Sequence, residues 1–159
     1  MIDKTKKVLD STILFITSVL LVVLVLGALW QVFSRYLFSA PSTFTNELLG
    51  FLLVWTSLLG ASYAVGSNQH LSLTFIKNKL EGRKGLIITI VNDLFILAFA
   101  VIVLIQGGIE AVNLTMAQTT PILEIPVGVV YLVLPISGFL TVIYKLLDIK
   151  NYKKWIGSR

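Results

Sequence analysis

The apolar residues of this chain fall into long runs that are separated by short polar connections. A helix needs about 20 mostly apolar residues to cross a hydrocarbon core about 30 Å thick. The run Leu94–Ile109 is shorter than this, but it reaches that length when it is extended back to Gly85, with Asp93 accepted near one end of the helix. The pattern therefore predicts an all-α integral membrane protein with four transmembrane helices. No Asp, Glu, Lys or Arg interrupts the runs Ser11–Ser34, Leu48–Gln69, Leu94–Ile109 and Ile125–Tyr144.

Residues with strong positional preferences set the expected helix ends. Ser42 and Thr43 are candidate N-caps of the second helix, because their hydroxyl groups accept hydrogen bonds from backbone N–H groups of the first turn. Pro126 suits the first turn of the fourth helix, and Pro135 should kink that helix near its middle. We expect one membrane domain over residues 1–159, with helices at approximately 11–34, 46–69, 85–117 and 126–147.

The third helix is expected to be unusually long, since only Gly107 and Gly108 interrupt its apolar pattern before Ala117. At a rise of 1.5 Å per residue such a helix would measure about 50 Å. We therefore expect it to tilt in the bilayer or to protrude from it.

The polar connections predict short interfacial segments. His70–Leu80 places apolar residues at helical spacing with lysines between them, which is typical of an amphipathic segment at a membrane surface. A short interfacial helix is also expected within Phe38–Phe51, before the second transmembrane helix. Thr119–Pro126, which contains Pro121, is expected to turn the chain between the third and fourth helices.

The basic residues predict the orientation. Of 13 Lys and Arg residues, all but Arg35 lie in the N-terminal segment, the second connection or the C-terminal tail. Four spans place these three segments on one side, which the positive-inside rule makes cytoplasmic. Both termini are expected inside, and the net charge of +5 is explained by contact with anionic membrane lipids rather than nucleic acid.

No pattern in the sequence indicates catalysis or a cofactor. His70 is the only histidine and cysteine is absent, so metal sites built on these residues and Ser-His-Asp sets within the membrane are unsupported. Transport by this chain alone is also poorly supported, because carriers usually place polar groups near the bilayer midplane. We expect no enzyme activity, no catalytic or metal-binding residue and no cofactor.

Two adjacent polar residues, Asn92 and Asp93, fall in the first part of the predicted third helix. Asp93 lies about 12 Å along the helix from Gly85, near the cytoplasmic boundary. It is expected to pair with Lys145, whose helix ends on the same face; a functional polar contact is the alternative. Asn92 is expected to form a hydrogen bond with a neighbouring helix, as amide side chains commonly do in membranes.

Arg35 is the one basic residue expected on the outer face, beside Gln31 and Tyr36 at the end of the first helix. Its guanidinium lies at headgroup level if Trp30 is an interfacial anchor, so it can extend to lipid phosphate. The alternative is a specific contact. Glu47, at the start of the second helix, or polar groups of another subunit could bind the planar guanidinium.

Four stretches carry a resemblance to one family of membrane proteins: QVFSRY (Gln31–Tyr36), NELLGFLLVWTSLLGASYA (Asn46–Ala64), HLSL (His70–Leu73) and TTPILEIPVGVVYLVLPISG (Thr119–Gly138). They resemble the small membrane subunit, or DctQ-like component, of tripartite ATP-independent periplasmic (TRAP) transporters. Two positions depart from that pattern: Asn46-Glu47 stands where the family often has paired acids, and Thr74 stands where it often has Asp.

The resemblance implies a complex in the bacterial inner membrane. Its large polytopic permease subunit would carry substrate and sodium by an elevator-like movement, while the small subunit stays static. A periplasmic binding protein would deliver a carboxylate such as sialic acid or a C4-dicarboxylate. Candidate partner-interface or structural contacts are Gln31, Arg35, Tyr36, Glu47, His70, Asp93, Pro121, Pro126 and Pro135.

The competing hypothesis is an anchor or assembly subunit of another membrane complex, such as a respiratory enzyme. Such anchors usually hold haem with histidines inside the membrane, whereas His70 is placed at a helix end. An autonomous exporter would require a central acid, and Asp93 is expected near the edge of the bilayer.

Overall fold

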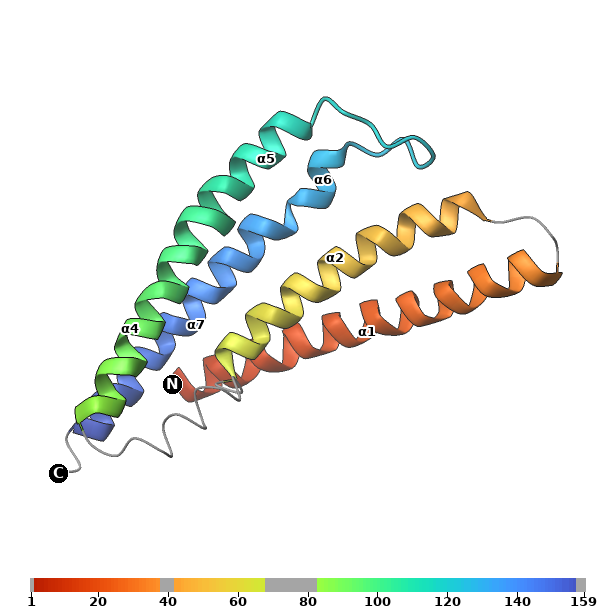
Figure 1. The fold of residues 1–159 in the computed structure, drawn as a ribbon. Helices are drawn as coiled ribbons and strands as arrows, with labels where there is room; N and C mark the ends of the chain where they lie inside the picture. The colour runs from red at the N-terminus through yellow and green to blue at the C-terminus, as the bar shows by residue number, and fades with distance from the viewer. Residues whose placement is uncertain (1, 38–41, 68–82, 157–159) are drawn as a thin grey trace.

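The computed structural model describes residues 2–37, 42–67 and 83–156, and every segment of regular structure in them is helical (Figure 1). Four stretches are long and apolar enough to cross a membrane: Thr5–Leu37, Thr43–Gly66, Ile87–Thr115 and Val127–Leu147. This confirms the predicted fold class. The helices are α1 (Ile2–Leu37), α2 (Thr43–Gly66), α4 (Arg83–Phe99), the π-helix η1 (Ala100–Gly107), α5 (Gly108–Thr115), α6 (Val127–Tyr131) and α7 (Val133–Ile156).

The helices form two antiparallel hairpins that meet along α2 and α7. In the first hairpin α1 packs against α2; in the second, α4, η1 and α5 run antiparallel to α6 and α7. The two hairpins approach each other near the end where α1 begins and α7 ends. They separate towards the other end, where the 116–126 loop joins α5 to α6 (Figure 1).

The core lies along α7. The side chains of Val133, Ser137 and Tyr144 are fully buried there. Gly66 of α2 packs against the Tyr144 ring so closely that a Cβ atom at this position would overlap it. Of the most apolar window of each span, 44% is buried in the fourth but only 11% in the first and third. The fourth span is therefore the centre of the bundle.

Ser42 caps α2 as the sequence predicted, because its side chain accepts a hydrogen bond from the Thr45 backbone N–H. The helix begins at Thr43 and ends at Gly66, about three residues earlier at each end than expected. The third helix begins at Arg83, ends at Thr115 and includes the eight π-helical residues of η1. The apolar pattern gives no indication of this π segment, because apolar residues cover all sides of the helix there.

Pro135 interrupts the fourth span as predicted. Proline has no N–H to donate to the carbonyl group four residues earlier, which here belongs to Tyr131. The helix breaks at Leu132, between α6 and α7. Pro126 is the N-cap residue with ψ 124°, so it immediately precedes α6 instead of lying within its first turn. The predicted amphipathic segment at His70–Leu80 lies outside the described residues, as does His70 itself.

Candidate functional site

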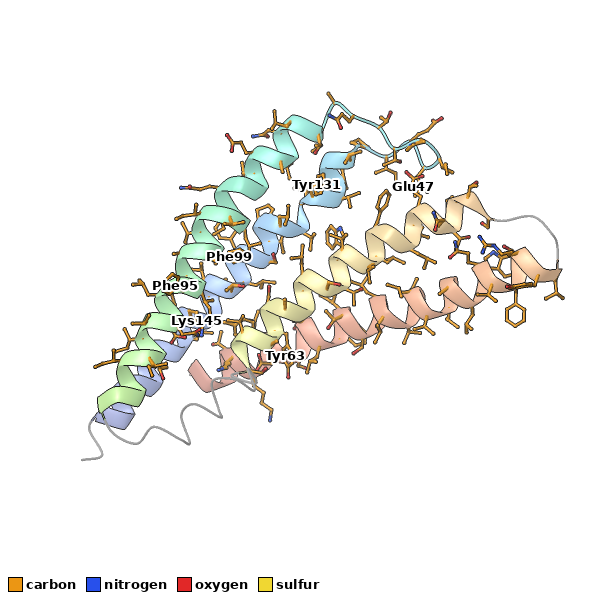
Figure 2. The ribbon with its side chains drawn as sticks, viewed as in Figure 1. Glu47, Tyr63, Phe95, Phe99, Tyr131 and Lys145 are labelled. Carbon is orange, nitrogen blue, oxygen red and sulfur yellow. The ribbon has the colours of Figure 1, made fainter. Side chains whose placement is uncertain are left out.

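The polar side chains inside the bundle mostly connect one helix to another. Lys145 of α7 and Asp93 of α4 form the ion pair that the sequence predicted, with Lys145 Nζ 2.7 Å from Asp93 Oδ1. Their side chains are 4% and 16% exposed, and Figure 2 shows Lys145 where α7 passes beside α4. Two opposite charges that bind each other avoid the cost of a lone charge in a medium of low polarity.

A second contact at this end joins α7 to α1. The Tyr144 hydroxyl donates a hydrogen bond of 2.7 Å to Asp10 Oδ1. Neither residue stands in a motif that predicts this contact. Asp10 does stand directly before the first uncharged run, and an acid at that place among lysines is a usable signal. Together these contacts tie α7 to both α1 and α4 near the ends of their spans.

Hydroxyl groups join α2 to α7 at the middle of the bundle. Ser62 Oγ donates to the Ser137 carbonyl oxygen at 3.0 Å, and Thr141 Oγ1 lies 3.4 Å from Ser62 Oγ. All three residues are buried. Small hydroxyl residues allow helix backbones to approach closely and supply hydrogen bonds where water is absent.

Trp55 connects α2 to the break in the fourth span. Its Nε1 donates a 3.1 Å hydrogen bond to the carbonyl oxygen of Val130, near the C-terminal end of α6. Carbonyl groups at a helix end lack donors from their own helix. The indole N–H therefore satisfies a backbone acceptor beside the break that Pro135 introduces.

Glu47 holds the loop at the other end of the bundle. Its Oε2 accepts hydrogen bonds from the backbone N–H groups of Ile122, at 3.1 Å, and Leu123, at 3.0 Å. Figure 2 shows Glu47 between the start of α2 and this loop. The carboxylate thus links the two hairpins where their helices are far apart.

The loop that Glu47 binds is a narrow hairpin-like turn. The Thr120 N–H donates to the Ile125 carbonyl at 2.9 Å, and the Val127 N–H donates to the Gln118 carbonyl at 2.8 Å. Glu124 adopts a left-handed conformation with φ 52°, which is unfavourable for a residue with a side chain. Pro121 lies in the exposed part of this turn.

Arg35 does not form the direct ion pair with Glu47 that the sequence allowed. Both residues are described, and no salt bridge joins them within 4.0 Å. Glu47 is instead directed to two backbone N–H groups, while Arg35 is exposed at the end of α1. Gln31 Nε2, one turn earlier, donates to Asn46 Oδ1 at 3.1 Å. Tyr36 is 78% exposed.

Two hollows lie between the helices. One, of about 420 Å³, lies between α1 and α2 and is lined almost entirely by apolar residues and Gly27. The other, of about 520 Å³, lies between α2 and α4 and contains hydroxyl groups of α7. Among the described residues, no three His, Cys, Asp or Glu side chains converge in a way that could hold a metal ion.

The chain matches the profile of the DctQ component of tripartite ATP-independent periplasmic transporters over residues 12–151. A Haemophilus influenzae relative, which carries the name of a TRAP transporter small permease protein, is 30% identical over 87% of this chain and 81% of its own length. The small permease protein of a sialic acid TRAP transporter from Vibrio cholerae is 26% identical over 80% of this chain and 79% of its own length.

A third relative is considerably longer. The isethionate TRAP transporter permease protein DctMQ of Oleidesulfovibrio alaskensis is 30% identical over 76% of this chain, which corresponds to 19% of that protein. The profile match covers most of the four-span bundle. The chain therefore belongs to the DctQ family, and it is a multi-pass membrane subunit of a TRAP transporter and not an enzyme.

Proposed function

We propose that this chain is the small accessory subunit of a sodium-coupled TRAP transporter in the bacterial inner membrane. In this proposal it packs against a large permease subunit and stabilises it, while the large subunit carries the substrate by an elevator-type movement. A periplasmic binding protein delivers the substrate, a carboxylate such as sialic acid or a C4-dicarboxylate.

The main support for this proposal is that the polar groups of the spans make contacts within the chain itself. The ion pair of Asp93 with Lys145 and the hydroxyl cluster at Ser62 bind helices of the same chain to one another. Coupled transport requires polar groups that bind and release a substrate or an ion. Groups that are engaged in static interhelical contacts suit a scaffold better than a carrier.

The outer surface of the helices supports packing against another subunit. Large apolar side chains point outwards along all four spans, and only 11% of the most apolar window of the first and third spans is buried. The long DctMQ relative is called a permease protein and matches this chain over 19% of its length. This supports a companion permease for the present chain.

Co-purification tests this function. The tagged chain is co-expressed with a large TRAP permease from the same organism and is purified in mild detergent. We expect the permease to be retained at a fixed ratio and to aggregate at a lower temperature when it is expressed alone. A permease that elutes separately and is equally stable without this chain would contradict the stabilising role.

A further inference from the structure

A groove runs between α2 and α4, with α7 as its floor. Among the described residues α2 and α4 do not pack on each other, whereas α7 contacts both. Leu58, Ala61 and Val65 line the α2 wall, and Phe95, Ile96 and Phe99 line the α4 wall. The space between them measures about 520 Å³ and is open on one side. The groove therefore has two apolar walls, one from α2 and one from α4.

The dimensions of the groove match one leaflet of a bilayer. Its long wall extends from Asn92 in α4 to Leu104 in η1, roughly 15 to 18 Å at helical rise. Half of a hydrocarbon core about 30 Å thick is about 15 Å. The groove therefore fits one extended hydrocarbon chain.

A polar group marks one end of this groove. Asn92 lines it, and the Asn92 Nδ2 atom is buried without a hydrogen-bond partner, contrary to the interhelical bond that the sequence predicted. Asn92 lies five residues into the third span, which begins at Ile87, or about 7.5 Å along the helix. The adjacent Asp93 is paired with Lys145. An amide donor without an acceptor costs free energy in such a place.

We propose that the groove binds one acyl chain of a glycerophospholipid from the leaflet on the side where α1 begins and α7 ends. The Asn92 amide turns about its χ2 torsion and donates a hydrogen bond to the ester carbonyl of that chain. The acyl chain extends between Phe95 and Phe99 on one wall and Ala61 on the other. An ester carbonyl is an available acceptor at this depth, whereas the backbone carbonyl groups of a neighbouring helix are already bonded.

Native mass spectrometry of the full-length chain, delipidated in detergent, tests this site. The probes are dioleoyl-phosphatidylethanolamine and its diether analogue, which lacks the ester carbonyl groups. We expect one diester lipid to bind with higher affinity than further lipids, and the diether lipid to bind about threefold more weakly, as expected for loss of one membrane hydrogen bond. Asn92→Ala should weaken diester binding about threefold and abolish the preference for it.

A matched pair of substitutions tests the groove itself. Ala61 and Ala98 are both exposed, but only Ala61 lines the groove. Ala61→Phe should reduce occupancy of the first lipid at least tenfold, while Ala98→Phe leaves it unchanged; circular dichroism checks that both variants are folded. Equal binding of diester and diether lipid by the wild type, or equal binding by the two alanine variants, would overturn the proposal. The proposal would also fail if Ala61→Phe still bound the first lipid but no longer retained the permease in co-purification. A protein would then occupy the groove.

Discussion

Single polar residues determine how the helices of this small protein are fixed relative to one another. Apolar side chains supply little preference between neighbours in a bilayer, since lipid tails are equally apolar. Among the specific contacts are the ion pair between Asp93 and Lys145, the hydrogen bond from the Tyr144 hydroxyl to Asp10, and the hydrogen bonds from the 119–126 turn to Glu47. Each connects segments that lie far apart in the sequence.

The ion pair between Asp93 and Lys145 should contribute strongly to stability. Lys145→Ala removes the positive charge that faces the Asp93 carboxylate at a site that is 16% exposed, so we expect a loss of about 2–3 kcal/mol in the free energy of unfolding. The double variant Asp93→Ala, Lys145→Ala should lose less than the sum of the two single variants. Equilibrium unfolding in mixed micelles measures this, and a coupling below about 0.5 kcal/mol would argue against the pair.

Glu47 should control the order of the loop after α5. Glu47→Ala removes the acceptor of the Ile122 and Leu123 N–H groups, and we expect hydrogen exchange of these amides to accelerate about tenfold or more. Glu47→Gln keeps an acceptor oxygen and should give an intermediate rate. Arg35→Ala is the control, since Arg35 forms no ion pair with Glu47. Exchange that responds to Arg35→Ala as strongly as to Glu47→Ala would contradict this assignment.

At the scale of the helices, the close approach of α2 to α7 is the central packing feature. A Cβ atom added to Gly66 would overlap the Tyr144 ring, whereas one added to Gly60 of the same helix meets no atom within 4 Å. Substituting alanine at Gly66 therefore tests the close packing, and the same substitution at Gly60 tests helix propensity alone.

Gly66→Ala should destabilise the bundle by about 1–3 kcal/mol, because a fully buried ring must move. Gly60→Ala should leave stability unchanged or raise it by up to about 1 kcal/mol, since alanine favours a helix more than glycine does. Unfolding in mixed micelles distinguishes them. Equal effects of the two substitutions would show that Tyr144 does not pack on Gly66 as described.

Local signals in the sequence were sufficient for most helices and insufficient for the contacts between them. Ser42 and Pro135 act through their own backbone neighbourhood, so the cap and the break could be predicted. Asp93 and Lys145 could be paired because both lie near helix ends expected on one face. The loop partner of Glu47 depends on how far the two hairpins separate, which sequence spacing does not encode. Arg35 is nearer to Glu47 in sequence and was therefore a candidate partner, but no salt bridge joins the two residues.

At the scale of the whole molecule, the two hairpins should be inserted with both termini in the cytoplasm. Twelve of 13 basic residues lie beyond, or close to, the helix ends that four spans place on one side. Alkaline phosphatase fused after Ser39 or Gln118 should therefore be active, and green fluorescent protein fused after Lys79 or Arg159 should be fluorescent. An active phosphatase fused after Arg159 would contradict the topology.

The proposed accessory role rests on the whole bundle, in which polar groups bind helix to helix and apolar faces point outwards. Sodium-driven uptake into liposomes tests it most directly, with this chain alone, with the large permease, and with both. The binding protein and a carboxylate substrate are present outside in every case. We expect uptake only when the permease is present, and the highest rate when both subunits are present. Uptake by this chain alone above that of empty liposomes would contradict the account.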